Sequence, residues 1–173
     1  MPCDRIRIDR RRTGGFTLLE IVLTLAILGV LGAMAGLGVV QITKGFVFSR
    51  DNTETAGKAQ LAMLRIIKEF TVVRSVGSGS ASAITFTAQH GAATTKTYTL
   101  SLSGANLMMN DGGSNDILAN RVTGFTLNYY DTYNGSASST WSPSRRIIEI
   151  TITVQAADGM TSSFSTRITP RNV

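Results

Sequence analysis

Glu20 is the residue whose type and position most clearly demand a chemical explanation. It lies at the start of a strongly apolar segment, because residues 21–40 contain no charged side chain. A carboxylate inside a hydrocarbon core costs about 2.5 to 3.5 kcal/mol on insertion scales. The position of Glu20 therefore predicts that another group offsets its charge.

His90 and the loop 110–116 give weaker chemical signals. His90 is the only histidine, and the sequence assigns it neither a nucleophile nor an orienting group, so we interpret it as an exposed loop residue. The loop offers several oxygens, including those of Asp111, Asn115 and Asp116, and calcium takes six to eight oxygen ligands. The spacing differs from that of an EF-hand, which favours a plain solvent loop over a calcium site.

The remaining candidates for chemistry do not form a catalytic set. The sequence contains no phosphate-binding glycine motif and no cysteine or histidine cluster that could bind zinc. We therefore predict no catalytic residue, no metal, no cofactor and no enzyme. Trp141, in the loop 133–143, could anchor a partner, although a tryptophan packed on a sheet is the commoner case. Arg145 and Arg146 form too weak a basic patch for nucleic acid to be an expected partner.

Residues 16–40 are predicted to form a membrane-spanning helix. About twenty apolar residues at 1.5 Å per residue are enough to cross a hydrocarbon core of roughly 30 Å. An ordinary secretory signal would place its cleavage site after the apolar region, whereas the well-placed glycine here, Gly15, precedes it. Cleavage at Gly15 would leave the membrane helix attached to the rest of the chain.

The residues around Glu20 resemble a known signature. A short basic stretch ends in Gly15, and Phe16, Thr17, two leucines, Glu20 and the apolar run follow in order. This order is similar to the class III signal of type IV pilins and type II secretion pseudopilins. The alternative is a signal anchor that happens to contain one glutamate.

The resemblance implies a processing step and an assembly step. Prepilin peptidase would cut between Gly15 and Phe16 and methylate the new amino terminus at Phe16. Glu20 would then pair with the amino terminus of a neighbouring subunit, and a buried carboxylate is tolerable when a cation meets it in low dielectric.

Half of the chain's net positive charge lies in the predicted leader, residues 1–15. The net charge is +6, and the leader accounts for +3 of it through five arginines and two aspartates. These residues are Arg5, Arg7, Arg10, Arg11, Arg12, Asp4 and Asp9. Basic residues before an apolar segment favour a cytoplasmic amino end, so we expect the carboxyl-terminal domain in the periplasm. Cys3, the only cysteine, is in the leader, so we expect no disulfide in the exported part.

Glycines in the apolar segment are predicted to serve helix packing. Gly32 and Gly36 have the spacing that lets helix backbones approach each other, although glycine is generally common in membrane helices. Gly36 and Gly38 flank Leu37, and each weakens the helix by about 1 kcal/mol relative to alanine. Whether the helix unwinds there remains open from the sequence.

The helix is predicted to continue beyond the membrane as an amphipathic segment, residues 41–76. Ala59, Met63, Ile66, Phe70 and Val73 fall at helical spacing and predict one buried face. The charged residues are expected mostly on the other side of the helix. They are Lys58, Arg65, Lys68 and Glu69. Residues 52–54 and Gly57 could interrupt the helix.

Residues 77–173 are predicted to form a β-rich domain after a flexible connection at 77–83. Ile148, Ile150, Ile152 and Val154 alternate with polar residues, which indicates a strand with one buried face. The full set of predicted strands covers residues 84–88, 96–102, 107–109, 122–130, 146–155 and 161–169. The resulting fold class is α+β, with a long N-terminal helix on an antiparallel sheet, which is the pilin fold that the resemblance implies.

The sequence thus predicts a structural subunit of a type IV pilus or a type II secretion pseudopilus. Stretches at 62–69, 118–131 and 169–172 resemble the larger minor subunits, the J-type pseudopilins and W-type minor pilins. The implied partners are prepilin peptidase, other pilin subunits, the inner-membrane assembly platform and, before assembly, membrane lipid. The implied location is the bacterial inner membrane and then the filament. Two alternatives remain: a tip-located minor pilin that binds DNA or a surface, and an unprocessed single-span protein with a periplasmic sensor or enzyme domain.

Overall fold

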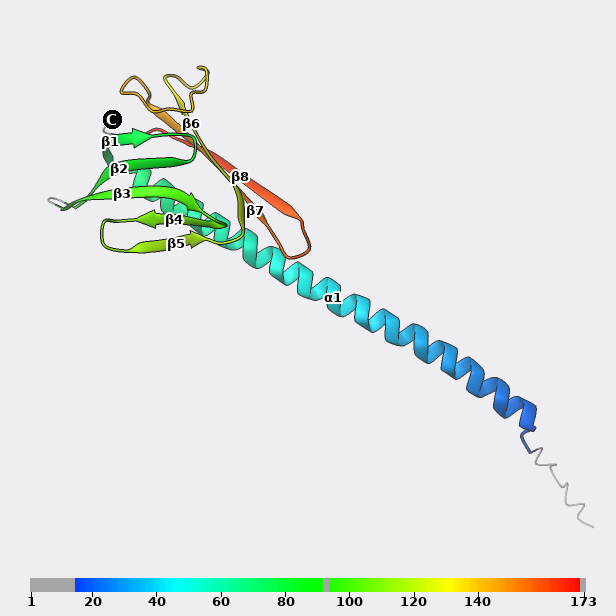
Figure 1. The fold of residues 1–173 in the computed structure, drawn as a ribbon. Coiled ribbons are helices and arrows are strands. Elements are labelled where there is room, and N and C mark those ends of the chain that lie inside the picture. Colours follow the sequence, from blue (N-terminus) through cyan, green and yellow to red (C-terminus); the bar gives the residue numbers. More distant parts are fainter. Residues whose placement is uncertain (1–14, 92–93, 172–173) are drawn as a thin grey trace, which may run out of the picture. The chain divides into compact units, whose positions relative to one another are not determined.

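The computed structural model of the protein describes residues 15–91 and 94–171. The predicted leader, with Cys3, lies outside the described residues except for Gly15, and so does Asn172. The chain divides into two units, Met1–Gly45 and Phe46–Val173, and helix α1 contributes to both (Figure 1). Each unit is described separately below.

Helix α1 spans Leu18–Thr71 without interruption. The glycines around Leu37 and the possible break at residues 52–57 are all helical. The helix ends earlier than predicted, because Val73 begins a strand instead of completing the apolar face of the helix. A run of β-branched residues, Thr71, Val72 and Val73, lies at this end, and such residues favour strands over helices.

Two antiparallel sheets follow the helix, where the sequence predicted one. The first has the order β1 to β5, and the second has the order β6, β7, β8. The strands of the first sheet are β1 (Val73–Gly79), β2 (Ala83–His90), β3 (Thr94–Ser103), β4 (Asn106–Asn110) and β5 (Asn115–Ala119). Those of the second are β6 (Val122–Tyr130), β7 (Ile147–Gln155) and β8 (Thr161–Ile168). The predicted α+β fold, a long helix packed on antiparallel β-structure, is confirmed (Figure 1).

The predicted flexible connection at 77–83 is wrong. Its first residues belong to β1, and a tight turn joins β1 to β2, with Ser80 and Ala83 exchanging backbone and side-chain hydrogen bonds. Gly79 is required here, since a Cβ atom at this position would lie 2.7 Å from both Tyr129 Oη and Trp141 Cβ. The small residues in this stretch therefore reflect close packing. A closely packed turn and a flexible linker can have the same composition.

The core joins the helix to both sheets. Ala59, Met63, Ile66 and Phe70 of α1 are buried, as the helical spacing predicts. Phe70 meets Phe86 of β2 edge to face, with ring centroids 4.8 Å apart. The alternating residues of β7, Ile148 to Val154, are buried on the same core as predicted. This packing fixes residues 55–70 of the helix under the β-structure.

Candidate processing and assembly site

The helix begins two residues after the predicted cleavage point, and its start is locally encoded. Thr17 is the N-cap: its Oγ1 accepts a hydrogen bond from the backbone N–H of Glu20 at 3.2 Å. Its backbone oxygen also accepts bonds from the N–H groups of Glu20 and Ile21. A threonine followed three residues later by glutamate is the capping-box pattern. Gly15 and Phe16 are therefore exposed residues outside the first turn, where a peptidase could reach the bond between them.

Glu20 lies in the first turn of the helix, with an exposed side chain. A carboxylate in this turn interacts favourably with the helix dipole, by about 0.3 to 1 kcal/mol at exposed positions. Within the part of the chain that the structure describes, Glu20 has no ion-pair partner. The helix start thus positions the carboxylate in the first turn, and no ion pair of the described chain neutralises it.

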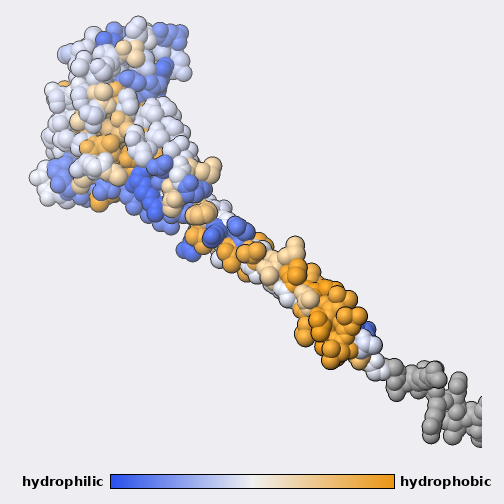
Figure 2. Space-filling model, turned by 45° about the vertical axis from the view of Figure 1, so that its right-hand side comes forward, coloured by the Kyte–Doolittle hydropathy of each residue, from blue (hydrophilic) through white to orange (hydrophobic). Residues whose placement is uncertain are grey.

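The apolar half of α1 is exposed along its whole described length. Every residue from 15 to 50 is exposed, including Leu28 at 63 % and Leu31 at 56 %. This part of the helix forms a predominantly orange, hydrophobic surface in Figure 2. Burying one such side chain is worth about 1.5 to 3 kcal/mol, so an uncovered rod of this kind is strongly unfavourable in water. The segment is long and apolar enough to cross a membrane.

The predicted packing glycines lie on this exposed helix. A Cβ atom at Gly32 or Gly36 would meet no atom within 4 Å. Within the described chain, no other helix packs against these glycines. Any partner helix would have to come from another molecule.

A family model for the prokaryotic N-terminal methylation motif matches residues 10–36. The chain carries this methylation motif. The match covers Gly15, Phe16, Glu20, Gly32 and Gly36, the residues singled out above. The motif supports a likeness to type IV pilin-like proteins, and the long apolar helix is consistent with membrane anchoring. Comparison with curated proteins and with solved structures gave no significant match.

The predicted loop 110–116 is largely ordered by its own hydrogen bonds. Asp111 accepts bonds from the backbone N–H groups of Gly113 and Ser114, and Lys96 Nζ lies 3.1 Å from its Oδ2. These contacts hold the pKa of Asp111 far below its usual range, and the two backbone hydrogen bonds contribute most to the lowering. Asn115 and Asp116 belong to strand β5, which the sequence did not predict. Among residues 15–91 and 94–171, no group of three or more His, Cys, Asp or Glu side chains is placed to bind a metal.

The prediction of a free, exposed His90 is wrong. His90 is the last residue of β2, and its Nε2 lies 2.9 Å from Glu69 Oε2 and 3.1 Å from Tyr98 Oη. Glu69 was predicted on the exposed side of the helix, but it is only 1 % exposed. Its Oε1 pairs with Arg65 Nε at 3.0 Å, whereas Oε2 forms no hydrogen bond in the described chain and has His90 Nε2 as a close polar contact.

Sequence reasoning missed this cluster because only one of its signals is local. Glu69 follows Arg65 by four residues, a spacing typical of exposed helical pairs. The partner from β2 is 21 positions away and became visible only once the strands were aligned. Burial, followed by the nearby Glu69 carboxylate, raises the pKa of Tyr98.

The two partner-binding candidates are largely engaged within the chain. Trp141 is partly buried and meets Tyr129 edge to face at 5.6 Å, so it packs on the β-structure. Burial raises the pKa of Tyr129 well above its usual value, and its hydroxyl donates to the backbone oxygen of Ser80. Arg145 pairs with Asp131 at 3.2 Å, which leaves Arg146 alone of the two arginines without an ion pair in the described chain.

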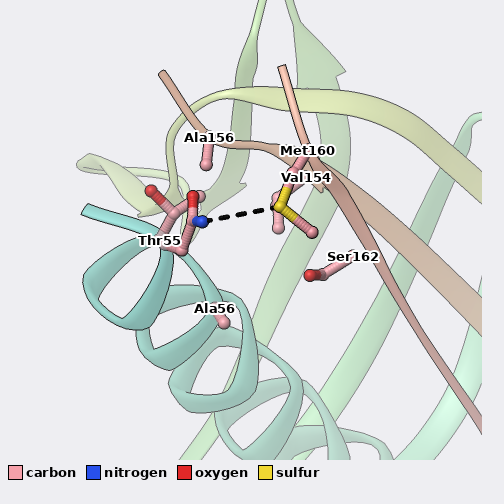
Figure 3. Close-up of a pocket in the computed structure, with 7 residues that line it drawn as sticks. Thr55, Ala56, Val154, Ala156, Met160 and Ser162 are labelled. Carbon is pink, nitrogen blue, oxygen red and sulfur yellow. Dashed lines mark hydrogen bonds between the residues drawn. The ribbon is translucent and has the colours of Figure 1, made fainter. Parts of the chain in front are cut away.

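Two residues of α1, Asp51 and Asn52, hold the loops of the second unit. Arg121 Nη1 lies 2.6 Å from Asp51 Oδ2, which also accepts the backbone N–H of Ala157 at 2.8 Å. Asn52 Nδ2 donates to Asp158 at 2.8 Å. Thr55 and Ala56 face Val154, Ala156, Met160 and Ser162 across a small cavity at this junction (Figure 3). The β7–β8 turn is thereby fixed beside the helix at residues 51–56.

Proposed function

We propose that the protein is a structural subunit, a minor pilin or pseudopilin, that is assembled into a type IV pilus or a type II secretion pseudopilus. The observation that carries the proposal is the coincidence of the methylation motif with an exposed apolar helix that begins within it. The resemblance of residues 62–69, 118–131 and 169–172 to the larger minor subunits favours a J-type or W-type role. The chain would act by assembly and would catalyse nothing itself.

The length of the exposed apolar helix supports assembly beyond simple anchoring. Helical residues 18–45 span about 42 Å at 1.5 Å per residue, against a hydrocarbon core of roughly 30 Å. The hydrocarbon core of a bilayer would therefore cover only part of this surface, whereas apolar helices of sibling subunits would cover all of it. Gly32 and Gly36 would let such helices approach closely.

Glu20 would supply the specificity of that assembly. Cleavage after Gly15 creates a new amine at Phe16, and the carboxylate of Glu20 lies in the adjacent first helical turn without an ion-pair partner in the described chain. The amine of one subunit would neutralise Glu20 of its neighbour, so that both charges leave the polar interface as a pair. A subunit out of register would leave both charges unpaired in apolar surroundings, which is costly.

The test separates processing from assembly. The variant Glu20→Ala should lose the leader normally and remain in the inner membrane, but it should be strongly depleted from the sheared filament fraction. Leu19→Ala, in the same exposed turn, is the matched control and should assemble. Normal incorporation of Glu20→Ala would contradict the pairing role.

The choice between the two assemblies requires a phenotype. Deleting the protein should abolish either exoprotein secretion or surface filaments. Loss of secretion identifies the pseudopilus, and loss of filaments identifies the pilus. Restoration by the wild-type chain and not by Glu20→Ala would assign that output to the assembled subunit.

A further inference from the structure

The first turns of the second unit carry an exposed apolar and basic surface that the proposed function does not use. Phe46 is 71 % exposed, Val47 55 % and Phe48 43 %, and Arg50 follows one turn after Phe46. Phe46, Val47 and Arg50 line the same shallow groove of α1, together with Asp51, which pairs with Arg121, and Glu54, which pairs with Lys58. Arg50 has no ion pair within residues 15–91 and 94–171. We call residues 46–50 the collar.

We propose that the collar is a lipid-binding surface, in which Phe46 and Phe48 lie at the membrane–water interface and Arg50 binds lipid phosphate. The inference rests on the membrane insertion proposed above. It adds the depth at which the chain sits and the chemical group that holds it there.

The helix length places the collar at this depth. Residues 18–45 span about 42 Å, and a bilayer including its headgroups is about 40 to 45 Å thick. An average tilt of about 20° shortens the projected length only slightly, to about 40 Å. With the start of the helix at one membrane surface, the residues that follow Gly45 therefore emerge among the headgroups of the other.

The residue types of the collar suit that environment. Aromatic side chains are stable at headgroup level because their rings are apolar and polarisable, and arginine is attracted to phosphate through paired N–H donors. Side chains on a helix lean toward its N-terminus, so Arg50 reaches back over the turn of Phe46, toward the membrane. The positive charge of Arg50 is thus complementary to the phosphate layer.

The folded part of the second unit begins immediately above the collar. Asp51 and Asn52 already hold Arg121 and the β7–β8 turn, and Met160 in that turn is 65 % exposed beside Asn52. Residues 46–50 therefore lie directly before the folded β-structure, and residues 41–45 separate them from the uncharged run that ends at Val40. Their burial in headgroups would bring the β7–β8 turn to the membrane surface.

Fluorescence depth measurement on the full chain in lipid nanodiscs tests this inference. In a Trp141→Phe background, Phe46→Trp should emit at short wavelength and be quenched more by bromine near the lipid carbonyls than by bromine near the chain ends. Leu28→Trp should show the opposite order. If Leu28→Trp is buried and Phe46→Trp emits as in water, the collar proposal is overturned while membrane insertion stands. If Leu28→Trp also emits as in water, insertion itself is wrong.

A charge reversal tests the role of Arg50. In nanodiscs containing phosphatidylglycerol, Arg50→Glu should shift the emission of Phe46→Trp to longer wavelength and weaken its quenching. Lys68→Glu is the matched control, because Lys68 is also exposed on α1 and has no ion pair in the described chain. Equal effects of the two reversals, or none from Arg50→Glu, would exclude a specific phosphate contact.

Discussion

Glu69 Oε2 on helix α1 lies 2.9 Å from His90 Nε2 on strand β2, and the carboxylate is almost completely buried. Arg65 holds its other oxygen at 3.0 Å. A buried carboxylate is costly unless polar or charged groups meet it, so the contacts with Arg65 and His90 favour one position of the last helical turn against the first sheet. The junction of helix and sheet therefore depends on a polar contact as well as on the apolar core.

Replacing His90 is expected to weaken this junction. His90→Ala removes the imidazole that lies 2.9 Å from the buried Glu69 Oε2, which should lower the free energy of unfolding by about 1 to 3 kcal/mol. Urea unfolding of the full chain in detergent micelles, followed by the fluorescence of Trp141, measures the change. Thr97→Ala, at an exposed position of β3, should change it by less than about 0.5 kcal/mol. Equal stability of the two variants would show that the contact contributes nothing.

The stability of the second unit should fall in acid. Arg121, and then the backbone N–H of Ala157, hold the pKa of Asp51 below its usual value. Because the folded pKa is lower than the unfolded one, the contribution of Asp51 is fully present above about pH 4 and is lost as the pH falls through the folded pKa. Asp51→Asn should therefore be less stable than wild type at pH 7 and should approach it at lower pH. A constant difference between pH 7 and pH 2 would refute this linkage.

Gly79 should not tolerate a side chain. Gly79→Ala would place a methyl group 2.7 Å from Tyr129 Oη and from Trp141 Cβ, and overpacking of this kind costs about 1 to 3 kcal/mol. The strain should also change the emission spectrum of Trp141, which contacts both Gly79 and Tyr129. Gly77→Ala is the control, since its nearest new contact is an ordinary 3.7 Å. If both variants show wild-type stability and spectra, the close packing at Gly79 is not a constraint.

Residues with local signals were predictable from the sequence. The burial of Phe70 and Ile66 was predicted from helical spacing. Strand alternation likewise predicted the buried residues of β7, which are Ile148, Ile150, Ile152 and Val154. Each pattern depends only on neighbouring positions. The methylation motif was equally visible, since Gly15, Phe16 and Glu20 lie within six residues. These signals were enough to predict the fold class, and the processing site at Gly15 and Phe16 stays a prediction.

Residues whose role depends on distant partners were not predictable. Gly79 and the small residues after it have the composition of a linker, but Tyr129 and Trp141 pack against this turn. Asn115 and Asp116 are polar and were interpreted as loop, but they pair with β4. Glu69 looked exposed until β2 brought His90 to it. In each case tertiary contact overrode local composition.

The mass of the full protein, isolated from the membranes of cells that contain prepilin peptidase, tests the central claim most directly. We expect a chain that lacks residues 1–15, begins at Phe16 and carries one methyl group on its amino terminus. A chain that keeps residues 1–15, or one cleaved at another bond, would contradict the account.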